Sequence, residues 1–228
     1  MQEDNLMKLV TSLGKSEKNI NNVPVAISLI EHKIFGVIGN RKIRFDFSNQ
    51  ILLQLATFHS YDNMKFVILT NNENSDFWEH IKILPHNWNN NKTFRYFGVN
   101  INEYKEIFYI LEKIYNDRKE KKKENNITFN TRYIIINDCF NNIRNIEFIK
   151  NILNEQDDLG ISLIIIDNKI VNIPDQCQSF VQLSEAKCEY FESLVNNKPI
   201  QFEMDKNYID YFSCAKKLAN IPIKIISK

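Results

Sequence analysis

Two glycines and a lysine stand at a spacing that could hold phosphate. They lie in residues 36–42, directly after the start of an apolar run at Ile34, and residues 45–59 repeat their apolar positions with a helical period. A glycine turn between a strand and a helix holds anionic oxygens on its backbone N–H groups, while a lysine and a hydroxyl reach phosphate and Mg²⁺. We therefore interpret five residues as a phosphate-loop position: Gly36, Gly39, Asn40, Arg41 and Lys42.

This stretch departs from an intact phosphate loop at two positions. Counted from Gly36, Lys42 falls at the lysine position, but Arg41 replaces the second glycine and Ile43 replaces the serine or threonine. The loop is degenerate, and we assign no catalytic residue to it. Another GKS string, residues 14–16, has Leu9 where its first glycine should stand, so we interpret it as a helix end followed by a loop.

Asp138 ends a second apolar run, residues 131–138. In P-loop ATPases an acidic residue after such a strand helps to hold Mg²⁺, so Asp138 occupies a Walker-B-like position. The alternative is that Asn137 and Asp138 begin the turn before the next helix. We favour the turn, because a metal-binding carboxylate has little to act on without a complete phosphate loop.

The composition favours one packed domain. The chain has 228 residues, of which 43% are hydrophobic, enough for one sizeable core. Lys and Arg number 29 and Asp and Glu number 28, so no net field attracts nucleic acid. No apolar run approaches the roughly 18 residues that span a bilayer. The four cysteines lack metal-ligand spacing, so we expect reduced thiols and no metal site.

Strands and helices are expected to alternate along the chain. The apolar runs predict strands at residues 23–30, 34–38, 65–70, 93–99, 131–138, 161–166, 179–183 and 199–204. Helical periodicity predicts helices at residues 45–59, 76–83, 102–120, 143–154 and 208–219, and a short amphipathic one within residues 1–21. Ser75 is the expected N-cap of the second, and the charged run 118–124 is expected to be a solvated helix end. This order predicts an α/β fold with a mostly parallel sheet flanked by helices.

Six strings in a fixed order carry a family resemblance over nearly the whole chain. They are residues 22–29, 35–39, 55–62, 84–88 with Arg95, 159–162 and 174–177. Their strongest combination is HSYD followed by LPHNW. The strings resemble the cytosolic region of the EssC/EccC family, the membrane-bound FtsK/SpoIIIE-type ATPases of type VII secretion. The family-motif positions, which we expect to be structural, are His59, Ser60, Asp62, Pro85, His86, Trp88 and Arg95, with His59 as a helix cap.

The resemblance implies a RecA-like (P-loop NTPase-like) fold that has diverged from its catalytic relatives. It implies that residues 1–228 are a single ATPase-like domain of a longer membrane-anchored chain, between the transmembrane helices and the first complete ATPase module. The implied location is the cytoplasmic face of the cell membrane. The implied partners are other domains and subunits of a hexameric secretion motor, with secreted proteins as further candidates. No nucleic acid and no membrane insertion of this segment are expected.

Three functions are compatible with this sequence. The first is a non-catalytic or weakly catalytic domain that couples the membrane anchor to the ATPase modules, with no cofactor expected. The second is an active nucleotidase, in which Lys42 and Arg41 contact the phosphates of ATP and Asp138 holds Mg²⁺. The third is a protein-interaction module around Trp78, Trp88 and Phe97, for which core packing is the competing explanation.

Overall fold

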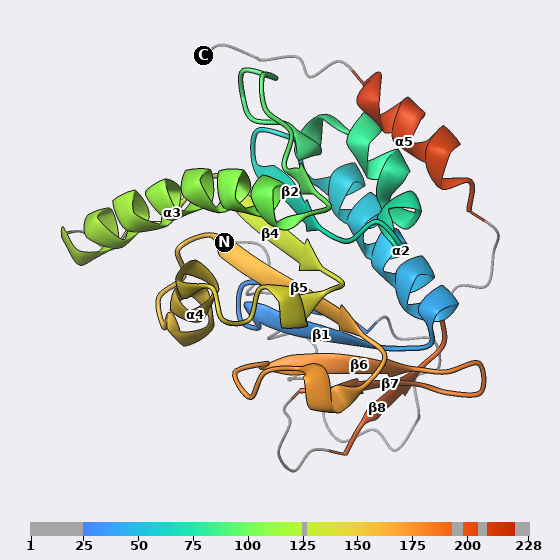
Figure 1. Cartoon of the computed structure of the whole chain (residues 1–228). Helices are drawn as coiled ribbons and strands as arrows, with labels where there is room; N and C mark the ends of the chain where they lie inside the picture. The colour runs from blue at the N-terminus through green and yellow to red at the C-terminus, as the bar shows by residue number, and fades with distance from the viewer. Residues whose placement is uncertain (1–24, 125–126, 193–197, 205–208, 222–228) are drawn as a thin grey trace, which may run out of the picture.

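The computed structural model describes residues 25–124, 127–192, 198–204 and 209–221, which centre on one twisted sheet (Figure 1). The helix expected within residues 1–21 and the GKS string at 14–16 lie outside the described residues. The described strands are β1 (Ile34–Gly39), β2 (Met64–Leu69), β3 (Phe97–Gly98), β4 (Arg132–Asn137), β5 (Ile161–Asp167), β6 (Ser179–Leu183), β7 (Cys188–Phe191) and β8 (Ile200–Phe202). Their order in the sheet is β3-β2-β4-β5-β1-β6-β7-β8.

The central strands are parallel, and the last two are antiparallel. β1 pairs with β5 on one side and β6 on the other, with Ile34 opposite Leu163 and Phe35 opposite Ser179. β6, β7 and β8 then form an antiparallel extension. The predicted mostly parallel α/β sheet is therefore confirmed.

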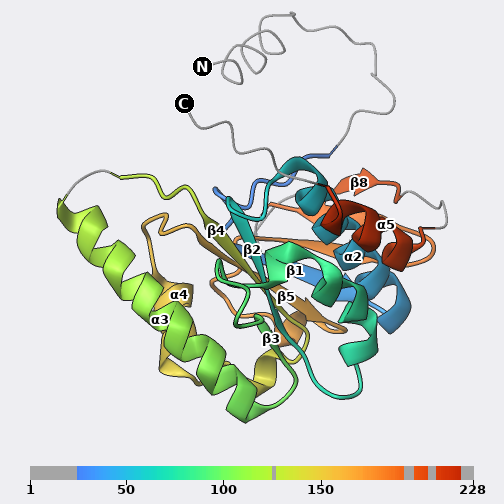
Figure 2. The same ribbon diagram turned by 90° about the horizontal axis from the view of Figure 1, so that it is seen from above.

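Helices cover both faces of the sheet (Figures 1 and 2). The α-helices are α2 (Arg41–Phe58), α3 (Ile101–Glu124), α4 (Glu147–Asn154) and α5 (Tyr211–Ala219), and the 3-10 helices are η1 (Ser75–Ile83), η2 (Pro85–Asn87), η3 (Phe140–Asn142) and η4 (Ile170–Asn172). α3 and α4 pack on one face, and α2, η1 and α5 pack on the other. Among the residues that the structure describes, no helix has the length and apolar character needed to cross a bilayer.

The alternation of side chains along β1 explains why its sequence is apolar throughout. Ile34 and Ile38 belong to the core on the α3 and α4 face, whereas Phe35 and Val37 belong to the core on the α2 face. A strand that is covered on both faces needs apolar residues at every position. The same rule accounts for β4 and β5.

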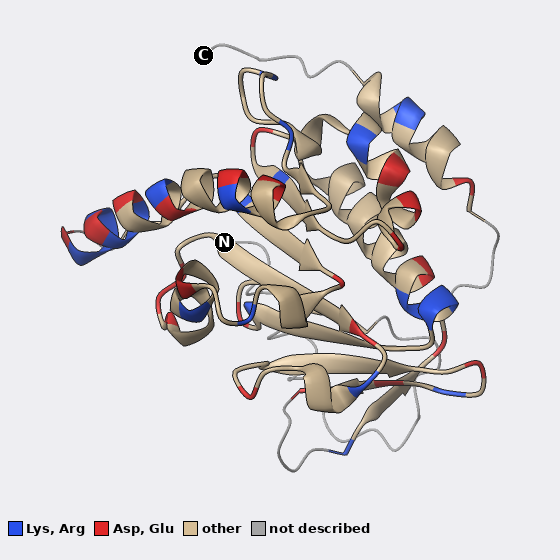
Figure 3. Cartoon of the chain, in the orientation of Figure 1, with Lys and Arg blue, Asp and Glu red and all other residues tan. Residues whose placement is uncertain are grey.

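Charges of both signs alternate along the outer half of α3 (Figure 3). Lys121 and Asp117, one turn apart, form an ion pair of 2.8 Å on exposed side chains. The solvated helix end predicted for residues 118–124 is confirmed for its exposed face, but Arg118 is buried. Its guanidinium donates to the carbonyl oxygens of Leu159 and Thr131 at 2.7 and 2.8 Å.

The predicted strand at residues 23–30 is wrong for the part that the structure describes. Residues 25–28 have no regular secondary structure and 29–31 form a turn. Both edges of β1 are already occupied by β5 and β6, so the alternating residues Val25, Ile27 and Leu29 pack on the α2 face without joining that part of the sheet. The Ser162 hydroxyl donates to Leu29 O at 2.7 Å and fixes the segment.

Other bounds also differ from the sequence prediction: α2 begins at Arg41 instead of residue 45, and α4 begins at Glu147 instead of residue 143. The strand expected at 93–99 shrinks to β3, because Arg95 forms an isolated antiparallel bridge with Trp88 instead. η1 begins at Ser75 and is a 3-10 helix, and its N-cap residue is Asn74, without a side-chain capping bond. The hairpin strand β7 was not predicted; the Ser184 N–H donates to Lys187 O at 2.9 Å in the preceding turn.

Candidate functional site

The edge where the parallel strands end is the expected position of a ligand-binding site in this kind of sheet. Ligands of open α/β sheets bind outside the carboxyl ends of the strands. Here β1 ends at Gly39, β2 is followed by Thr70, β4 is followed by Asp138, and β5 ends at Asp167. Both sequence-predicted parts of a nucleotide site, the glycine stretch and Asp138, therefore lie at this edge.

The glycine turn predicted at residues 36–42 is wrong. Gly36 and Gly39 lie within β1, and Asn40 alone separates the strand from α2. The Asn40 side chain accepts from Ile43 N at 3.1 Å as an N-cap. A Cβ atom on Gly36 would lie 2.9 Å from the Phe180 Cβ, and one on Gly39 would lie 2.8 Å from Leu183 O. The glycines thus permit the close approach of β6, and no loop is present to wrap a phosphate.

Arg41 and Lys42 form the first turn of α2. The Arg41 Nη2 donates to Asn74 Oδ1 at 2.8 Å and also to Glu73 O, and its guanidinium lies 5.2 Å from the centroid of the Phe77 ring. Lys42 is exposed, and its charge acts on Asp46, one helical turn away. Arg41 therefore holds the loop before η1, while Lys42 points to solvent at the helix surface.

Arg44, which sequence reasoning missed, is a further cation at the strand ends. Its Nη1 donates to Gly39 O at 3.1 Å, and its Nε is buried without a partner among the described residues. Burial lowers the Arg44 pKa, while the nearby charges of Asp167 and Asp138 raise it. The helical spacing from Arg41, three residues earlier, was the available signal, because it places both side chains on one face of α2.

The Asp138 carboxylate binds two protein donors through one oxygen, while its Oδ1 is buried without a partner among the described residues. Asp138 is 8% exposed, and its Oδ2 accepts hydrogen bonds from Thr70 Oγ1 and Trp78 Nε1, each at 2.8 Å. Burial raises the Asp138 pKa, and the hydrogen bonds from Trp78 and Thr70 act in the opposite direction. Trp78 is fully buried, so this ring of the proposed interaction surface belongs to the core instead. Asp138 thereby ties η1 to the sheet.

The HSYD and LPHNW strings meet at the opposite end of β2. His59 is the C-cap of α2 and caps through its backbone N–H, which donates to Leu55 O. Its carbonyl pairs with His86 Nε2 at 2.8 Å, and the His86 ring stacks on Phe66 at 5.1 Å between centroids. The His86 pKa is lowered, chiefly by burial. The two strings therefore fasten the start of β2 to η2.

The remaining motif positions also make structural contacts. The Ser60 carbonyl accepts from Asn63 N and Met64 N, both at 3.0 Å, and the Asp62 carbonyl accepts from Thr131 Oγ1 at 2.8 Å. Pro85 is in the first turn of η2. Asn87, which the sequence did not single out, is fully buried and donates to Phe66 O and Tyr96 O at 3.0 and 2.8 Å.

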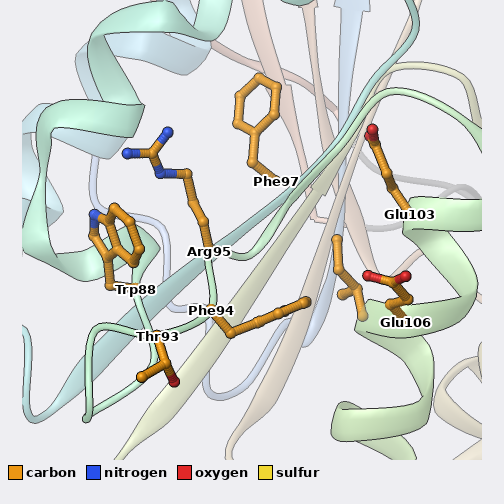
Figure 4. A pocket seen from close by; sticks show the side chains of 8 residues that line it. Trp88, Thr93, Phe94, Arg95, Phe97, Glu103 and Glu106 are labelled. Atoms are coloured by element: carbon orange, nitrogen blue, oxygen red, sulfur yellow. The ribbon is translucent and has the colours of Figure 1, made fainter.

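Trp88 and Arg95 line a pocket of about 390 Å³ at the β3 edge (Figure 4). Its lining residues are Trp88, Thr93, Phe94, Arg95, Phe97, Glu103, Glu106 and Ile107. The Arg95 guanidinium stacks on the Trp88 ring at 4.3 Å from the centroid, and no described residue accepts a hydrogen bond from it. Across the pocket, Glu103 caps α3 by accepting from Val99 N at 2.6 Å. This is a second site, at the edge strand β3, which β2 separates from β4.

The parallel central sheet with helices on both faces is a RecA-like α/β fold. No protein-family model matches the chain. EccC of Geobacillus thermodenitrificans is 24% identical over 212 residues, covering 90% of this chain and 14% of that protein. EssC of Staphylococcus aureus is 22% identical over 232 residues, covering 96% and 15%. The chain is homologous to the EssC/EccC ATPases of type VII secretion, and it spans about one seventh of the length of these curated relatives.

Solved structures of these proteins share the fold. EssC ATPases 2 and 3 from Geobacillus thermodenitrificans superpose with a TM-score of 0.62 at 12% identity, covering 83% of this chain and 43% of that chain. Thermomonospora curvata EccC ATPases 2 and 3, in complex with a signal sequence peptide, give 0.55 at 13% identity, covering 69% and 32%. At such identities the likeness is one of fold.

Proposed function

We propose that this chain is a non-catalytic or weakly catalytic ATPase-like domain of a type VII secretion motor, coupling a membrane anchor to ATPase modules. Homology to EssC/EccC along nearly the whole chain supports its place in such a motor. The observation that carries the lack of catalysis is the connection between β1 and α2, where Asn40 alone stands in place of a phosphate-binding turn. On this proposal the domain belongs to a longer chain and lies at the cytoplasmic face of the membrane.

The strand ends do not fit a Mg²⁺-nucleotide. A phosphate loop needs several backbone N–H groups in a turn, but a single residue, Asn40, lies between β1 and α2. Ile43 offers no hydroxyl for Mg²⁺. Asp138 Oδ2 already accepts two hydrogen bonds, and Oδ1 is buried. Arg44 supplies a fixed positive charge beside Asp138 and Asp167.

The same contacts offer a route for mechanical coupling. Asp138 holds Trp78 of η1, and His80 of η1 stacks on Tyr211 of α5 at 5.2 Å between centroids. The Tyr211 hydroxyl in turn donates to Asp46 O on α2 at 3.1 Å. A displacement of the strand ends would thus reach α5 through packed side chains. Where an ATPase module uses this edge to bind nucleotide, we infer that this domain uses it to transmit movement.

An active Mg²⁺-dependent nucleotidase is the alternative. It requires the first turn of α2 to unwind so that Lys42 reaches a phosphate, and it requires Asp138 to leave Trp78. Calorimetric titration with ATP and Mg²⁺ separates the two proposals. We expect binding weaker than about 100 µM, or about 5.5 kcal/mol, and equal phosphate release from wild type and Asp138→Asn. Tighter binding with turnover that Asp138→Asn abolishes would establish the nucleotidase.

The pocket at the β3 edge supports a second function, a protein-interaction module. Its half-buried aromatic side chains, Trp88 and Phe97, flank the unpaired Arg95 guanidinium, and β3 is an edge strand to which an extended segment could add. A signal sequence peptide is bound in the Thermomonospora curvata EccC structure. We therefore propose secreted protein segments as candidate ligands.

Fluorescence anisotropy with a labelled signal sequence peptide tests this second function. Arg95→Gln should weaken binding at least about tenfold, because a hydrogen bond from the charged Arg95 guanidinium to the peptide would contribute about 1.5 to 3 kcal/mol. Lys105→Gln, at an exposed position of α3, is the matched control and should bind normally. Equal affinity of wild type and Arg95→Gln would remove the pocket as the site.

A further inference from the structure

A buried lysine stands in the second position of β2. Lys65 is 1% exposed, and it ranks with the core aromatic residues among the largest fully buried side chains of the described chain. Every other residue of β2 is apolar. Lysine is almost never fully buried unless its charge is paired, so this position calls for a partner.

The protein itself supplies no such partner among the residues that the structure describes. No carboxylate lies within ion-pair distance of the Lys65 ammonium group, and no described oxygen accepts a hydrogen bond from it. Its described contact is the Tyr61 ring, whose centroid lies 5.7 Å away. A cation–π contact compensates only part of what an ammonium group loses when it leaves water.

A second lysine is brought to the same ring by a strained backbone. Lys92 has φ +54°, and within the described ranges it is the only residue other than glycine with a positive φ. Its ammonium nitrogen lies 5.9 Å from the centroid of the Tyr61 ring. Asn89 holds this turn, since its Oδ1 accepts from Thr93 N at 2.9 Å and its carbonyl accepts from Lys92 N at 3.0 Å. The loop thus adds a second positive charge at the Tyr61 ring, and the Lys92 backbone is held at a positive φ to place it there.

The surrounding charges leave this cluster positive. Asp62 is the acidic residue whose charge acts on Lys65, and the charge of Lys92 opposes it. His86, edge-on to Tyr61 at 6.4 Å between centroids, adds no negative charge. Two ammonium groups therefore face one carboxylate that is not in contact with either of them.

We propose that Lys65 and Lys92 bind a phosphate-type oxyanion beside Tyr61. Lysine ammonium groups bind phosphate as compact point charges, and a tetrahedral oxyanion has enough acceptors to serve two of them. The site lies at the start of β2, and Lys65 is five residues, or about 17 Å, from Thr70 at the strand ends near Asp138. It is distinct from the nucleotide position. The oxyanion could be free phosphate or the phosphate of an anionic lipid headgroup.

Thermal unfolding at constant ionic strength, with chloride exchanged for inorganic phosphate, tests the site. Phosphate should raise the Tm of the wild-type chain in a saturable way, because a ligand that binds the native state stabilises it. Lys65→Met should lose this response while unfolding at the same or a higher temperature in chloride, since its apolar stem needs no counter-charge. Lys92→Gln should weaken the phosphate affinity at least about tenfold, and the exposed Lys105→Gln control should respond as wild type does.

Vesicles separate the two sources of the anion. Co-sedimentation with phosphatidylcholine vesicles that contain phosphatidylglycerol, and not with pure phosphatidylcholine, supports the headgroup if both Lys65→Met and Lys92→Gln abolish it. A free-phosphate response lost in both variants supports a soluble anion. The proposal is overturned if wild type responds to neither, or if the response persists unchanged in both variants.

Discussion

Replacing Asp138 by Asn and by Ala distinguishes a structural carboxylate from a metal-binding one. In Asp138→Asn, the side-chain carbonyl can still accept hydrogen bonds from Trp78 Nε1 and Thr70 Oγ1. In Asp138→Ala, both donors lose their acceptor inside the core. If the carboxylate is structural, Asp138→Asn should keep the stability of the wild type and Asp138→Ala should not. If it is a metal ligand, both variants should lose the Mg²⁺-dependent activity.

The magnitudes follow from the two hydrogen bonds. Leaving a buried donor unsatisfied costs about 1 to 3 kcal/mol, so the loss of the acceptor for two donors in Asp138→Ala should lower the unfolding free energy by about 2 to 6 kcal/mol. For a chain of this size, 1 kcal/mol corresponds to about 2 to 4 °C in Tm, which gives a fall of at least about 4 °C. Asp138→Asn should stay within about 1 kcal/mol of wild type, since the lost charge was itself held in a desolvated place.

The pH dependence adds a sign that can be checked. Burial raises the Asp138 pKa in the folded state. A raised carboxyl pKa contributes stability that is fully present below the unfolded value, about 3.9, and is lost as the pH rises through the folded value. Asp138→Asn should therefore gain stability relative to wild type as the pH increases from about 4 toward neutrality.

Urea unfolding of the three proteins, followed by the fluorescence of Trp78 and Trp88, measures these differences. Circular dichroism provides a probe that does not depend on the tryptophans. If Asp138→Asn is as unstable as Asp138→Ala at neutral pH, the negative charge itself is required and the structural explanation fails. Mg²⁺-dependent phosphate release by the wild type, but by neither variant, would refute the structural explanation in the same way.

Three further changes test the surrounding structure. Gly36→Ala should lose about 1 to 3 kcal/mol in urea unfolding, because its Cβ would lie 2.9 Å from the Phe180 Cβ, and an unchanged midpoint would mean that β6 can retreat. His80 is buried against Tyr211, and its pKa is lowered to about 4. The free energy of unfolding should therefore fall by up to about 3 kcal/mol as the pH falls from about 6.5 to 4. A stability curve of the same slope in His80→Phe would exclude His80 as the source. Arg41→Ala should lose at most about 1 kcal/mol and leave ATP titrations unchanged, whereas a changed ATP affinity would restore Arg41 as a phosphate ligand.

The strand and helix order was predictable because its signals are local. Residues 179–183 were predicted as a strand and form β6 with the same bounds, and the buried face of α3 carries the predicted apolar side chains. A two-sided apolar strand and an amphipathic helix each reveal their periods within a few residues. The same local logic overextended the strand at 93–99, because the bridge between Trp88 and Arg95 depends on a turn that no period encodes.

The site was predictable in position but not in geometry. Asp138 lies at the carboxyl end of β4, as its place after a strand indicated, and β5 separates β4 from β1. Its donor Trp78 lies 60 residues earlier in the chain. The glycines of β1 pack against Phe180 and Leu183, which follow much later in the chain. Such contacts arise only in the folded sheet. A glycine spacing that suits a phosphate loop is therefore compatible with a tightly packed strand.

Side chains at the strand ends connect the surrounding elements to one another, although Asp138 Oδ1 and Arg44 Nε have no partner among the described residues. Arg41 holds the loop before η1, Asp138 holds η1 itself, and His80 of η1 meets α5. In a nucleotide-binding module, such contacts would be made and broken as phosphate comes and goes. Here the protein's own side chains make the connections, so the proposed coupling acts as a rigid link. A rigid link passes on a movement that another module generates, which is the role expected of a domain between an anchor and its motor.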